Sequence, residues 1–524
     1  MATTRKELAA ASLGCIFSRA GTALAACLVL CLLACLGKGS EPDLTPPARI
    51  ILFSMDTVRA DLVTGYGAEN HTPALREIAS EGVLFRNSYA ASTYTIPSHM
   101  SIFTGLDPVE HGVLDESSML DPQVPVLAEM LQAGGYRTRA FHEGGYVAAR
   151  FGFDRGFESY SQLKRLAVVD DRLDSILEWM RAATDDRYFL FLHTYAAHFP
   201  YGGFESSLDE NARQERFSEA KIERWRELAR TGKLDSLSEE ELYSCMIFNN
   251  LALRRPDMIH GCGHRLPPAF AESATFEEDR QAILASYIDR IRLIDAAIGR
   301  IRDTLIELGQ WDDTLFIVLG DHGEAFFEHG RQRHGYIPFN EVLKVPLIIS
   351  FPKLLRERGG RVVEGLVWHL DILPTISSLT GLPLPTERLV GLDLAPILTS
   401  QEEIPADRTV HPVVLHAQHA SDEPMRRVAL QRSLKYVQGS PQFGDEVGLL
   451  FDLAADPGEI RNQRHILPTD FETMAAISNR HVSTLTPGQA VLQPALRPGA
   501  VEDLGTAGLS QEAEEQLREL GYIE

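Results

Sequence analysis

Two almost continuously apolar segments constrain the fold of this chain most. Residues 49–55 read RIILFSM and residues 314–319 read TLFIVL, the pattern of strands that are buried on both faces of a sheet. β-Rich runs alternate with helical patterns elsewhere, which predicts an α/β fold: a mostly parallel sheet sandwiched by helices. Each apolar segment stops at an acidic residue, Asp56 or Asp321. These carboxylates are therefore expected at the carboxyl ends of strands, where open α/β sheets bind their ligands.

The pattern predicts one large domain, residues 48–404, and a smaller one behind it. Residues 202–280 are polar and helix-prone, so we interpret them as a helical insertion over the sheet. Short β-like pieces predict a small C-terminal antiparallel subdomain, 405–470, and residues 471–524 are expected to be a surface tail with a terminal helix at 510–520. The other predicted strands are 83–90, 136–141, 187–195 and 345–350, and the predicted helices are 72–81, 125–133, 172–183, 279–308 and 366–379.

The beginning of the chain has the pattern of an export signal. Basic residues precede an apolar run, 20–36, which ends in Leu-Leu-Ala-Cys at Cys35 and is followed by a polar linker, 36–47. The Leu-Leu-Ala-Cys run resembles a bacterial lipobox, so residues 1–35 are interpreted as a lipoprotein-type signal peptide with a lipid anchor at Cys35. An ordinary signal peptide or an uncleaved anchor is the alternative. In each case the body is expected in the periplasm or at the cell surface.

Charge and cysteine usage limit the partners. The net charge of -23, without a Lys/Arg block, disfavours a nucleic-acid partner, because the phosphate backbone would be repelled. Beyond the leader and Cys35 only Cys245 and Cys262 remain, so at most one disulfide is expected in the mature body. Nothing in the sequence indicates an oligomeric state.

A hydroxyl and an imidazole complete a candidate metal site. The segment ASTYTIPSHMSIFTG places Thr95 where a loop becomes a helix, with backbone N–H groups suited to an anion. Asp56, Asp321, His322 and the Thr95 hydroxyl would supply oxygen and nitrogen ligands to one divalent cation. Such a cation would lower the pKa of the hydroxyl and neutralise an oxyanion, which predicts a metal-assisted ester hydrolase. The alternative is structural: Asp56 and Thr95 could each be a helix cap.

Histidines lie close to the same strand ends in the sequence. His193 ends a predicted strand, His198 follows it, and His334 lies in the loop after residue 322. We expect His193 and His334 to protonate a leaving group or to bind anionic oxygens, and His198, His99 and His142 to contact the substrate. A histidine among aromatic residues can also be a packing residue with its own hydrogen bonds.

A series of motifs between about residues 48 and 462 resembles the sulfatase family of the alkaline-phosphatase-like superfamily. The motifs are MDTVRAD (55–61), HTPALREIASEGVLFRNSYA (71–90), IPSHMSIFTGLDPVEHGV (96–113), GDHGE (320–324), EVLKVPLII (341–349), LDILPTISSLTGLPLP (370–385) and LFDLAADPGE (450–459). The resemblance implies an alkaline-phosphatase-like fold. It also implies that Asp56, Asp321 and His322 bind a divalent cation together with residue 95 as nucleophile, while His193 and His334 contact the head group. The family's usual cation is Ca²⁺, and His322 is also compatible with Mn²⁺ or Zn²⁺.

The chain departs from the family at the nucleophile. The family signature C/S-x-P-x-R provides a Cys or Ser that is oxidised to formylglycine, but this chain reads Thr95-Ile-Pro-Ser-His99, and the threonine methyl prevents that oxidation. The family's Lys-Trp-His element is replaced by AFHEGGYV (140–147), and the Asp321-His322 pair resembles the phosphodiesterase and phosphonate monoesterase branches.

These features leave three hypotheses open. The first is a hydrolase of sulfuric or phosphoric esters of a small molecule, glycan or lipid head group, with Thr95 as the nucleophile. The second is a threonine-dependent phosphotransferase acting on an envelope lipid or glycan. The third is an envelope binding protein without turnover. The sequence does not distinguish sulfate from phosphate esters.

Overall fold

The computed structural model describes most of the chain between residues 45 and 492, as one compact unit from Pro46 onward. The described ranges are 45–68, 70–164, 173–183, 187–202, 217–251, 274–356, 358–386, 388–400, 402–415, 425–440, 445–488 and 491–492. The predicted leader, Cys35 and the predicted helix at 510–520 lie outside them. Within these ranges, no helix combines the length and apolar character needed to cross a membrane.

An eight-stranded sheet forms the centre of the molecule, in the order β11-β2-β10-β7-β1-β6-β4-β5. Only β10 runs antiparallel to its neighbours, so the predicted mostly parallel sheet is confirmed. The strands are β1 (Arg49–Met55), β2 (Val83–Tyr89), β4 (Arg137–His142), β5 (Ser159–Gln162), β6 (Tyr188–Thr194), β7 (Thr314–Gly320), β10 (Leu347–Ser350) and β11 (Arg361–Trp368).

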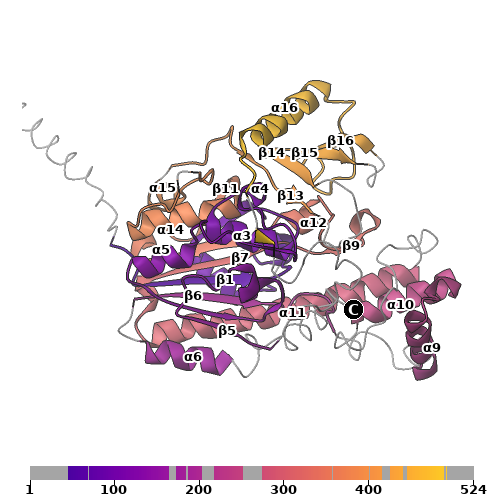
Figure 1. Ribbon diagram of the computed structural model, residues 1–524, viewed down its shortest axis with the longest axis horizontal. Coiled ribbons are helices and arrows are strands. Elements are labelled where there is room, and N and C mark those ends of the chain that lie inside the picture. Colours follow the sequence, from indigo (N-terminus) through magenta and orange to yellow (C-terminus); the bar gives the residue numbers. More distant parts are fainter. Residues whose placement is uncertain are drawn as a thin grey trace, which may run out of the picture. The chain divides into compact units, whose positions relative to one another are not determined.

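Helices cover both faces of this sheet, as Figure 1 shows. Alternate residues of β1 point to opposite faces: Ile51 and Phe53 pack into one core, and Ile50 and Leu52 into the other. The first core is closed by α2 (Pro73–Glu81), α6 (Leu173–Ala182) and α11 (Ala274–Glu307), and the second by α3 (Thr95–Thr104), α5 (Leu127–Ala133) and α14 (Ile372–Thr380). Shorter elements are α4 (Pro108–His111), α12 (Asn340–Leu343), α13 (Pro352–Leu355), α15 (Ala395–Thr399), β3 (Ser118–Met119), β8 (Ala325–Phe326), β9 (Gln332–Arg333) and β17 (Val491–Leu492).

A second, antiparallel sheet follows the large one, as predicted. Its strands are β12 (Thr409–Val410), β13 (Val413–Val414), β14 (Arg426–Gln431), β15 (Leu434–Ser440) and β16 (Asp445–Asp452). Helix α16 (Pro468–Thr484) packs on it through Met474, against Ala429, Tyr436 and Leu450. The boundary expected at residue 470 therefore falls inside a helix that covers this sheet.

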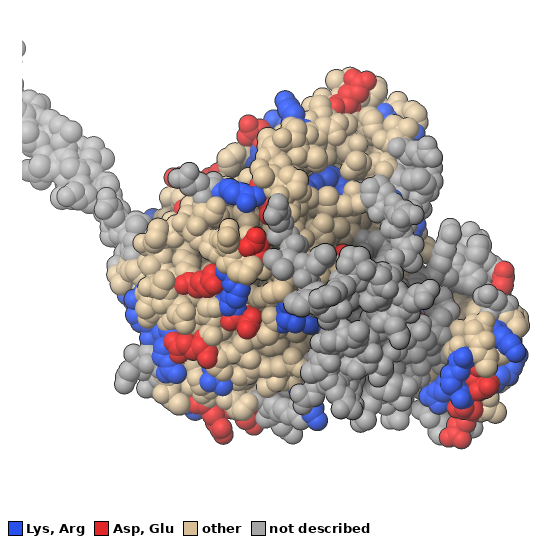
Figure 2. Space-filling view, in the orientation of Figure 1, with Lys and Arg blue, Asp and Glu red and all other residues tan. Residues whose placement is uncertain are grey.

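The described part of the predicted insertion is helical. It contains α9 (Glu219–Arg230) and α10 (Glu239–Leu251), and Tyr243 of α10 donates a hydrogen bond to Asp279 of α11 at 2.6 Å. Cys245 on α10 is disulfide-bonded, and Cys262 lies outside the described ranges. Acidic and basic side chains alternate along the exposed α9, and they are interspersed elsewhere on the face in Figure 2.

One predicted helix, 366–379, is wrong in its first half. Residues 361–368 form the strand β11, which pairs in parallel with β2, and α14 begins only at Ile372. The apolar residues 366–368 are buried because they lie inside this strand. Pro374 falls in the first turn of α14, where its missing N–H costs no helical hydrogen bond.

Candidate active site

Three neighbouring parallel strands bring polar residues to one rim of the sheet. β1 lies between β6 and β7, and Met55 at its end is in register with Thr194 and Gly320. Asp56 and Asp321 come directly after these positions and leave adjacent strands at the same level. The convergence that the sequence predicted is confirmed by this register.

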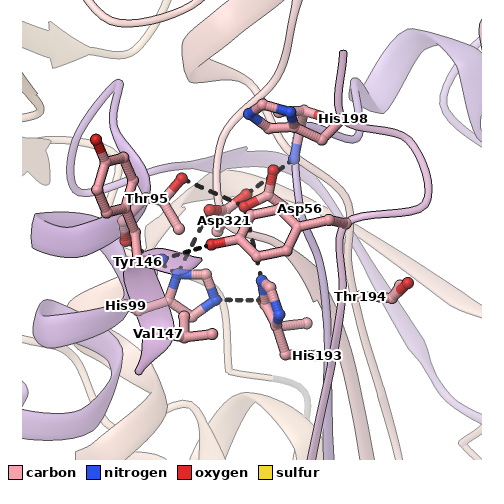
Figure 3. A network of polar contacts seen from close by, with 12 residues as sticks. Asp56, Thr95, His99, Tyr146, Val147, His193, Thr194, His198 and Asp321 are labelled. Carbon is pink, nitrogen blue, oxygen red and sulfur yellow. Dashed lines mark hydrogen bonds and ion pairs between the residues drawn. The ribbon is translucent and has the colours of Figure 1, made fainter. Parts of the chain in front are cut away.

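Helix α3 begins at Thr95 with the extended residue Tyr94 as its N-cap. All ten residues of α3 are buried, and the helix ends at Gly105, whose left-handed φ of 68° suits glycine. This burial fixes the direction of the helix, so its first residue lies beside the strand ends (Figure 3).

Asp56, Asp321 and His322 form a fully buried group whose ligand atoms all lie within 4.8 Å of one another. Oδ1 of Asp321 accepts hydrogen bonds from the N–H groups of Thr57 and His322, at 3.0 and 2.7 Å. Its Oδ2, like Oδ1 of Asp56, has no hydrogen-bond partner. Burial raises the pKa of Asp56 to about 7, despite the opposing effect of His322. Two buried carboxylates with unpartnered oxygens beside an imidazole fit a divalent cation.

Thr95 contacts two members of this group. Its Oγ1 donates to Oδ2 of Asp56 at 3.3 Å and lies 3.1 Å from Nε2 of His322. Nδ1 of His322 lies 3.0 Å from the carbonyl oxygen of Gly323, which can only accept, so Nδ1 carries the proton. Nε2 of His322 therefore directs its lone pair toward the Thr95 hydroxyl and the carboxylates.

His99 makes hydrogen bonds within the protein that fix the first turn of α3. Its Nδ1 donates to the carbonyl oxygen of Thr95 at 2.9 Å and lies 3.4 Å from Oδ2 of Asp321, while Ser54 donates to its Nε2 at 2.8 Å. Burial lowers the pKa of His99 to about 3, so the imidazole is neutral. With these contacts, His99 positions both Thr95 and Asp321.

His193, near the end of β6, lies at the same rim of the sheet. Its Nε2 lies 3.6 Å from Oδ2 of Asp56, and neither ring nitrogen has a hydrogen-bond partner. Burial lowers its pKa to about 3. A neutral imidazole in this place has one N–H that can donate a hydrogen bond to an oxygen of a bound ester, and one nitrogen that can accept a hydrogen bond.

His198 and His334 lie on another side of the same group. The ring of His334 lies 4.4 Å from that of His322 and 5.2 Å from that of His198, measured between centroids. Nδ1 of His334 lies 2.9 Å from Oε1 of Glu324, whose pKa burial raises to about 8. Glu324 stands in the GDHGE motif, but nothing in that motif indicates its contact with His334.

His142 is more remote from the group. It accepts a hydrogen bond from the N–H of Gly144 at 3.1 Å, and its ring lies 4.1 Å from that of Tyr160. Burial lowers the pKa of His142 well below its usual value, and the nearby His193 adds to this effect.

Further residues support the site without an obvious sequence signal. Glu143 accepts hydrogen bonds from the Thr194 hydroxyl and the Tyr195 N–H, at 2.9 and 2.8 Å, and so fixes the segment after His193. Ser98 donates to the carbonyl oxygen of Asp321 at 2.6 Å. In the part of the chain that the structure describes, no Lys or Arg forms an ion pair with Asp56 or Asp321.

This sheet, with a buried carboxylate–imidazole group and a hydroxyl at the carboxyl ends of its strands, has the architecture of the alkaline-phosphatase superfamily of ester hydrolases. The sequence model of one family of this superfamily, Sulfatase, matches residues 48–382 of the chain. The chain therefore belongs to the sulfatase family, and it is an ester hydrolase of the sulfatase and phosphonate monoester hydrolase type. The predicted family and fold are confirmed.

Individual proteins of known function or structure are similar to this chain over most of their length. The chain is 22% identical to an N-acetylglucosamine-6-O-sulfatase of Bacteroides thetaiotaomicron, covering 85% of this chain and 87% of that one. A protein solved in complex with its substrate D-glucosamine-2-N,6-O-disulfate is similar with a TM-score of 0.62 and 19% identity, over 84% of this chain and 98% of that one. The phosphonate monoester hydrolase of Silicibacter pomeroyi is similar with a TM-score of 0.61 and 20% identity, over 84% of this chain and 96% of that one.

Proposed function

We propose that this protein is a metal-dependent hydrolase of sulfate, phosphate or phosphonate esters in which Thr95 is the nucleophile. The observation that carries the proposal is the position of the Thr95 hydroxyl, 3.3 Å from Asp56 and 3.1 Å from His322. The leader predicted in residues 1–35 supports a site of action outside the cytoplasm.

Asp56, Asp321 and His322 would hold a divalent cation, Ca²⁺, Mn²⁺ or Zn²⁺, which supplies Lewis acidity and positive charge when bound. The protein's own residues then prepare the attack. Oδ2 of Asp56 accepts the hydrogen bond of the Thr95 hydroxyl and so directs the oxygen lone pairs away from itself. The hydrogen bond from Nδ1 of His99 to the Thr95 carbonyl oxygen holds the start of α3 in this orientation.

The reaction requires transfer of the Thr95 hydroxyl proton to Oδ2 of Asp56, attack by Oγ1 on sulfur or phosphorus, and rupture of the bond to the bridging ester oxygen. That oxygen needs a proton as it leaves. His334 suits this role because Glu324 orients it through Nδ1, at 2.9 Å, and its ring lies 4.4 Å from that of His322, beside the Thr95 hydroxyl. Water then gives a proton to His334 and attacks the same sulfur or phosphorus atom. The bond to Oγ1 breaks, Oγ1 takes back its proton from Asp56, and the anion is released.

The imidazoles of His193 and His198 would bind the remaining anionic oxygens. His193 and His198 are buried on β6 and the segment after it, and both rings contact Tyr195, at 4.5 and 5.5 Å between centroids. Among the described residues, no Lys or Arg pairs with Asp56 or Asp321, so the bound cation would balance much of the charge of the ester.

The proposal is tested with purified protein and four substrate classes: aryl sulfate, phosphate monoester, phosphate diester and phosphonate monoester. We expect turnover of at least one class that is abolished by a chelator, restored by a divalent cation and lost in Asp321→Asn. Release of the anion without any acceptor alcohol separates hydrolysis from transfer. Turnover that survives both the chelator and Asp321→Asn would contradict the proposal.

A further inference from the structure

Arg150 carries a positive charge that the protein leaves without a partner. It lies in the short 3-10 helix η3 (Ala149–Phe151), which follows β4 in the chain. Its guanidinium makes no hydrogen bond or ion pair with any described residue, and its Nε and Nη2 are enclosed. The side chain as a whole is only half-buried, so Nη1 is the nitrogen that remains accessible. Charged groups that are partly withdrawn from water normally have a counter-charge, so an arginine without one is a candidate for binding an external anion.

The guanidinium rests on an aromatic wall that leads to Thr95. Its Cζ lies 4.5 Å from the centroid of the Phe151 ring, and that ring lies 6.3 Å from the ring of Tyr146. The ring of Tyr146 lies 5.1 Å from that of Tyr94, the N-cap residue directly before Thr95. In Figure 3 the side chain of Tyr146 is seen beside Thr95. The wall therefore connects the unpaired guanidinium to the proposed nucleophile.

The same wall continues to the imidazole of His193. The hydroxyl oxygen of Tyr195 accepts a hydrogen bond from the N–H of Tyr146 at 2.9 Å. The ring of Tyr195 lies 4.5 Å from that of His193. Burial lowers the pKa of Arg150, and the neighbouring side chains of Tyr146 and Tyr195 oppose this shift. Arg150 therefore lies next to residues that contact both the start of α3 and the end of β6.

The contacts of Arg150 within the protein leave its N–H groups unused. Glu116 is near enough to oppose the effect of burial on the pKa of Arg150, but Arg150 forms no ion pair with it. The ring of Phe151 supports the flat face of the guanidinium, whereas hydrogen-bond acceptors are needed in its plane. Carboxylates, sulfates and phosphates supply such acceptors and form strong, charge-assisted hydrogen bonds with arginine. An anion at Nη1 would provide the missing partner.

We propose that Arg150 is a specificity-determining residue that binds a second anionic group of the substrate, a carboxylate or a further sulfate or phosphate. The reacting ester would lie at Thr95 and His193, and Arg150 would favour those esters whose alcohol part carries another negative charge. This inference rests on the proposed function, because that function places the ester at Thr95.

The test is calorimetric titration of the full-length protein with two series of phosphonates, with Ca²⁺, Mn²⁺ or Zn²⁺ present. Their P–C bond replaces the ester bond, so they are not hydrolysed. One series ends in a carboxylate, separated from phosphorus by spacers of increasing length, and the other ends in a methyl group at the same distances. We expect at least one carboxylate-ended ligand to bind about tenfold more tightly than its methyl-ended counterpart. This preference should disappear in Arg150→Gln and persist in part in Arg150→Lys, which keeps the charge.

Arg139→Gln is the matched control. The side chain of Arg139 is also half-buried, its Cζ lies 4.6 Å from the ring of Phe141, and its Nε is enclosed without a partner. It differs in position, because it lies on β4 with its Cζ 5.4 Å from the ring of Trp179 on α6. The preference for the carboxylate should be the same in Arg139→Gln as in the wild type.

Two results would overturn the inference: no preference for the carboxylate at any spacer length, or a preference of equal size in Arg150→Gln. The methyl-ended series reports on the phosphonate site alone, and its unchanged affinity in Arg150→Gln shows that this variant is folded. If neither series bound, the anion site of the proposed function would be contradicted, and this inference with it. A failure of the role of Arg150 and a failure of the proposed function therefore give different results.

Discussion

Oγ1 of Thr95 lies 3.1 Å from Nε2 of His322, and Nδ1 of that imidazole is fixed by the carbonyl oxygen of Gly323. The hydroxyl thus shares one small, fully buried space with the ligand atoms of Asp56 and Asp321. A helix cap would direct its side-chain oxygen to the backbone N–H groups of its own helix. The contacts of Thr95 go instead to side chains of two other segments, which favours the catalytic interpretation.

Removal of the Thr95 hydroxyl should abolish turnover, while its methyl group should matter much less. We expect Thr95→Ala to lower kcat/KM roughly a thousandfold or more and Thr95→Ser to remain within about tenfold of the wild type. Steady-state kinetics on the best ester measures both. Equal activity in wild type and Thr95→Ala would exclude this residue as the nucleophile.

Divalent cations should stabilise the protein through Asp56, Asp321 and His322. A cation at about a hundred times its Kd adds about 2.7 kcal/mol to the free energy of unfolding, which raises Tm. Thermal unfolding after chelation and re-addition of Ca²⁺, Mn²⁺ or Zn²⁺ should show this rise in the wild type and in Asp289→Asn, whose side chain is 63% exposed. Asp321→Asn should not respond, and an undiminished response in that variant would place the cation elsewhere.

Arg427 should be important for stability because it binds the segment that follows α3. Its guanidinium donates to both oxygens of the buried Asp107, at 2.7 and 2.8 Å, and so links β14 to the large domain. Arg427→Met leaves that carboxylate without its main partner, and we expect a loss of roughly 3–5 kcal/mol in urea unfolding. Arg230→Met, which removes an exposed ion pair on α9, should cost about 0–1 kcal/mol. Similar losses in both variants would contradict this.

Asp107 should also make stability depend on acid pH. Burial opposes ionisation, but hydrogen bonds from His481 and Arg427 outweigh it and hold the pKa of Asp107 below its usual 3.8. A carboxyl with a lowered pKa stabilises the fold fully above its unfolded-state pKa, and this contribution disappears as the pH falls. Urea midpoints between about pH 5 and pH 3 should therefore fall more steeply in the wild type than in Asp107→Asn. Parallel slopes would show that Asp107 is not responsible.

The strand ends of the site could be predicted from the sequence because their signals are local. β1 and β7 are continuous apolar runs, and the acidic residue after each run marks the place where parallel strands gather their ligands. Asp56, Asp321 and His322, three of the four predicted metal ligands, follow these strands directly and form the buried group that could hold a cation.

The supporting contacts could not be predicted because they join residues far apart in the sequence. Ser54 and His99 are separated by 45 positions, and Ser98 and Asp321 by 223. The sequence predicts a helix at residues 366–368, which end β11, because they are uniformly apolar and such a short run fits either periodicity. Its pairing with β2, nearly 280 residues earlier, decides the outcome.

The most direct test of the account is mass spectrometry of the Thr95 peptide after rapid acid quenching of enzyme that is turning over its ester. The account predicts a sulfate, phosphate or phosphonate group on Thr95, absent from Thr95→Ala and from enzyme without substrate. Rapid turnover with unmodified Thr95, or the same adduct on another residue, would contradict it.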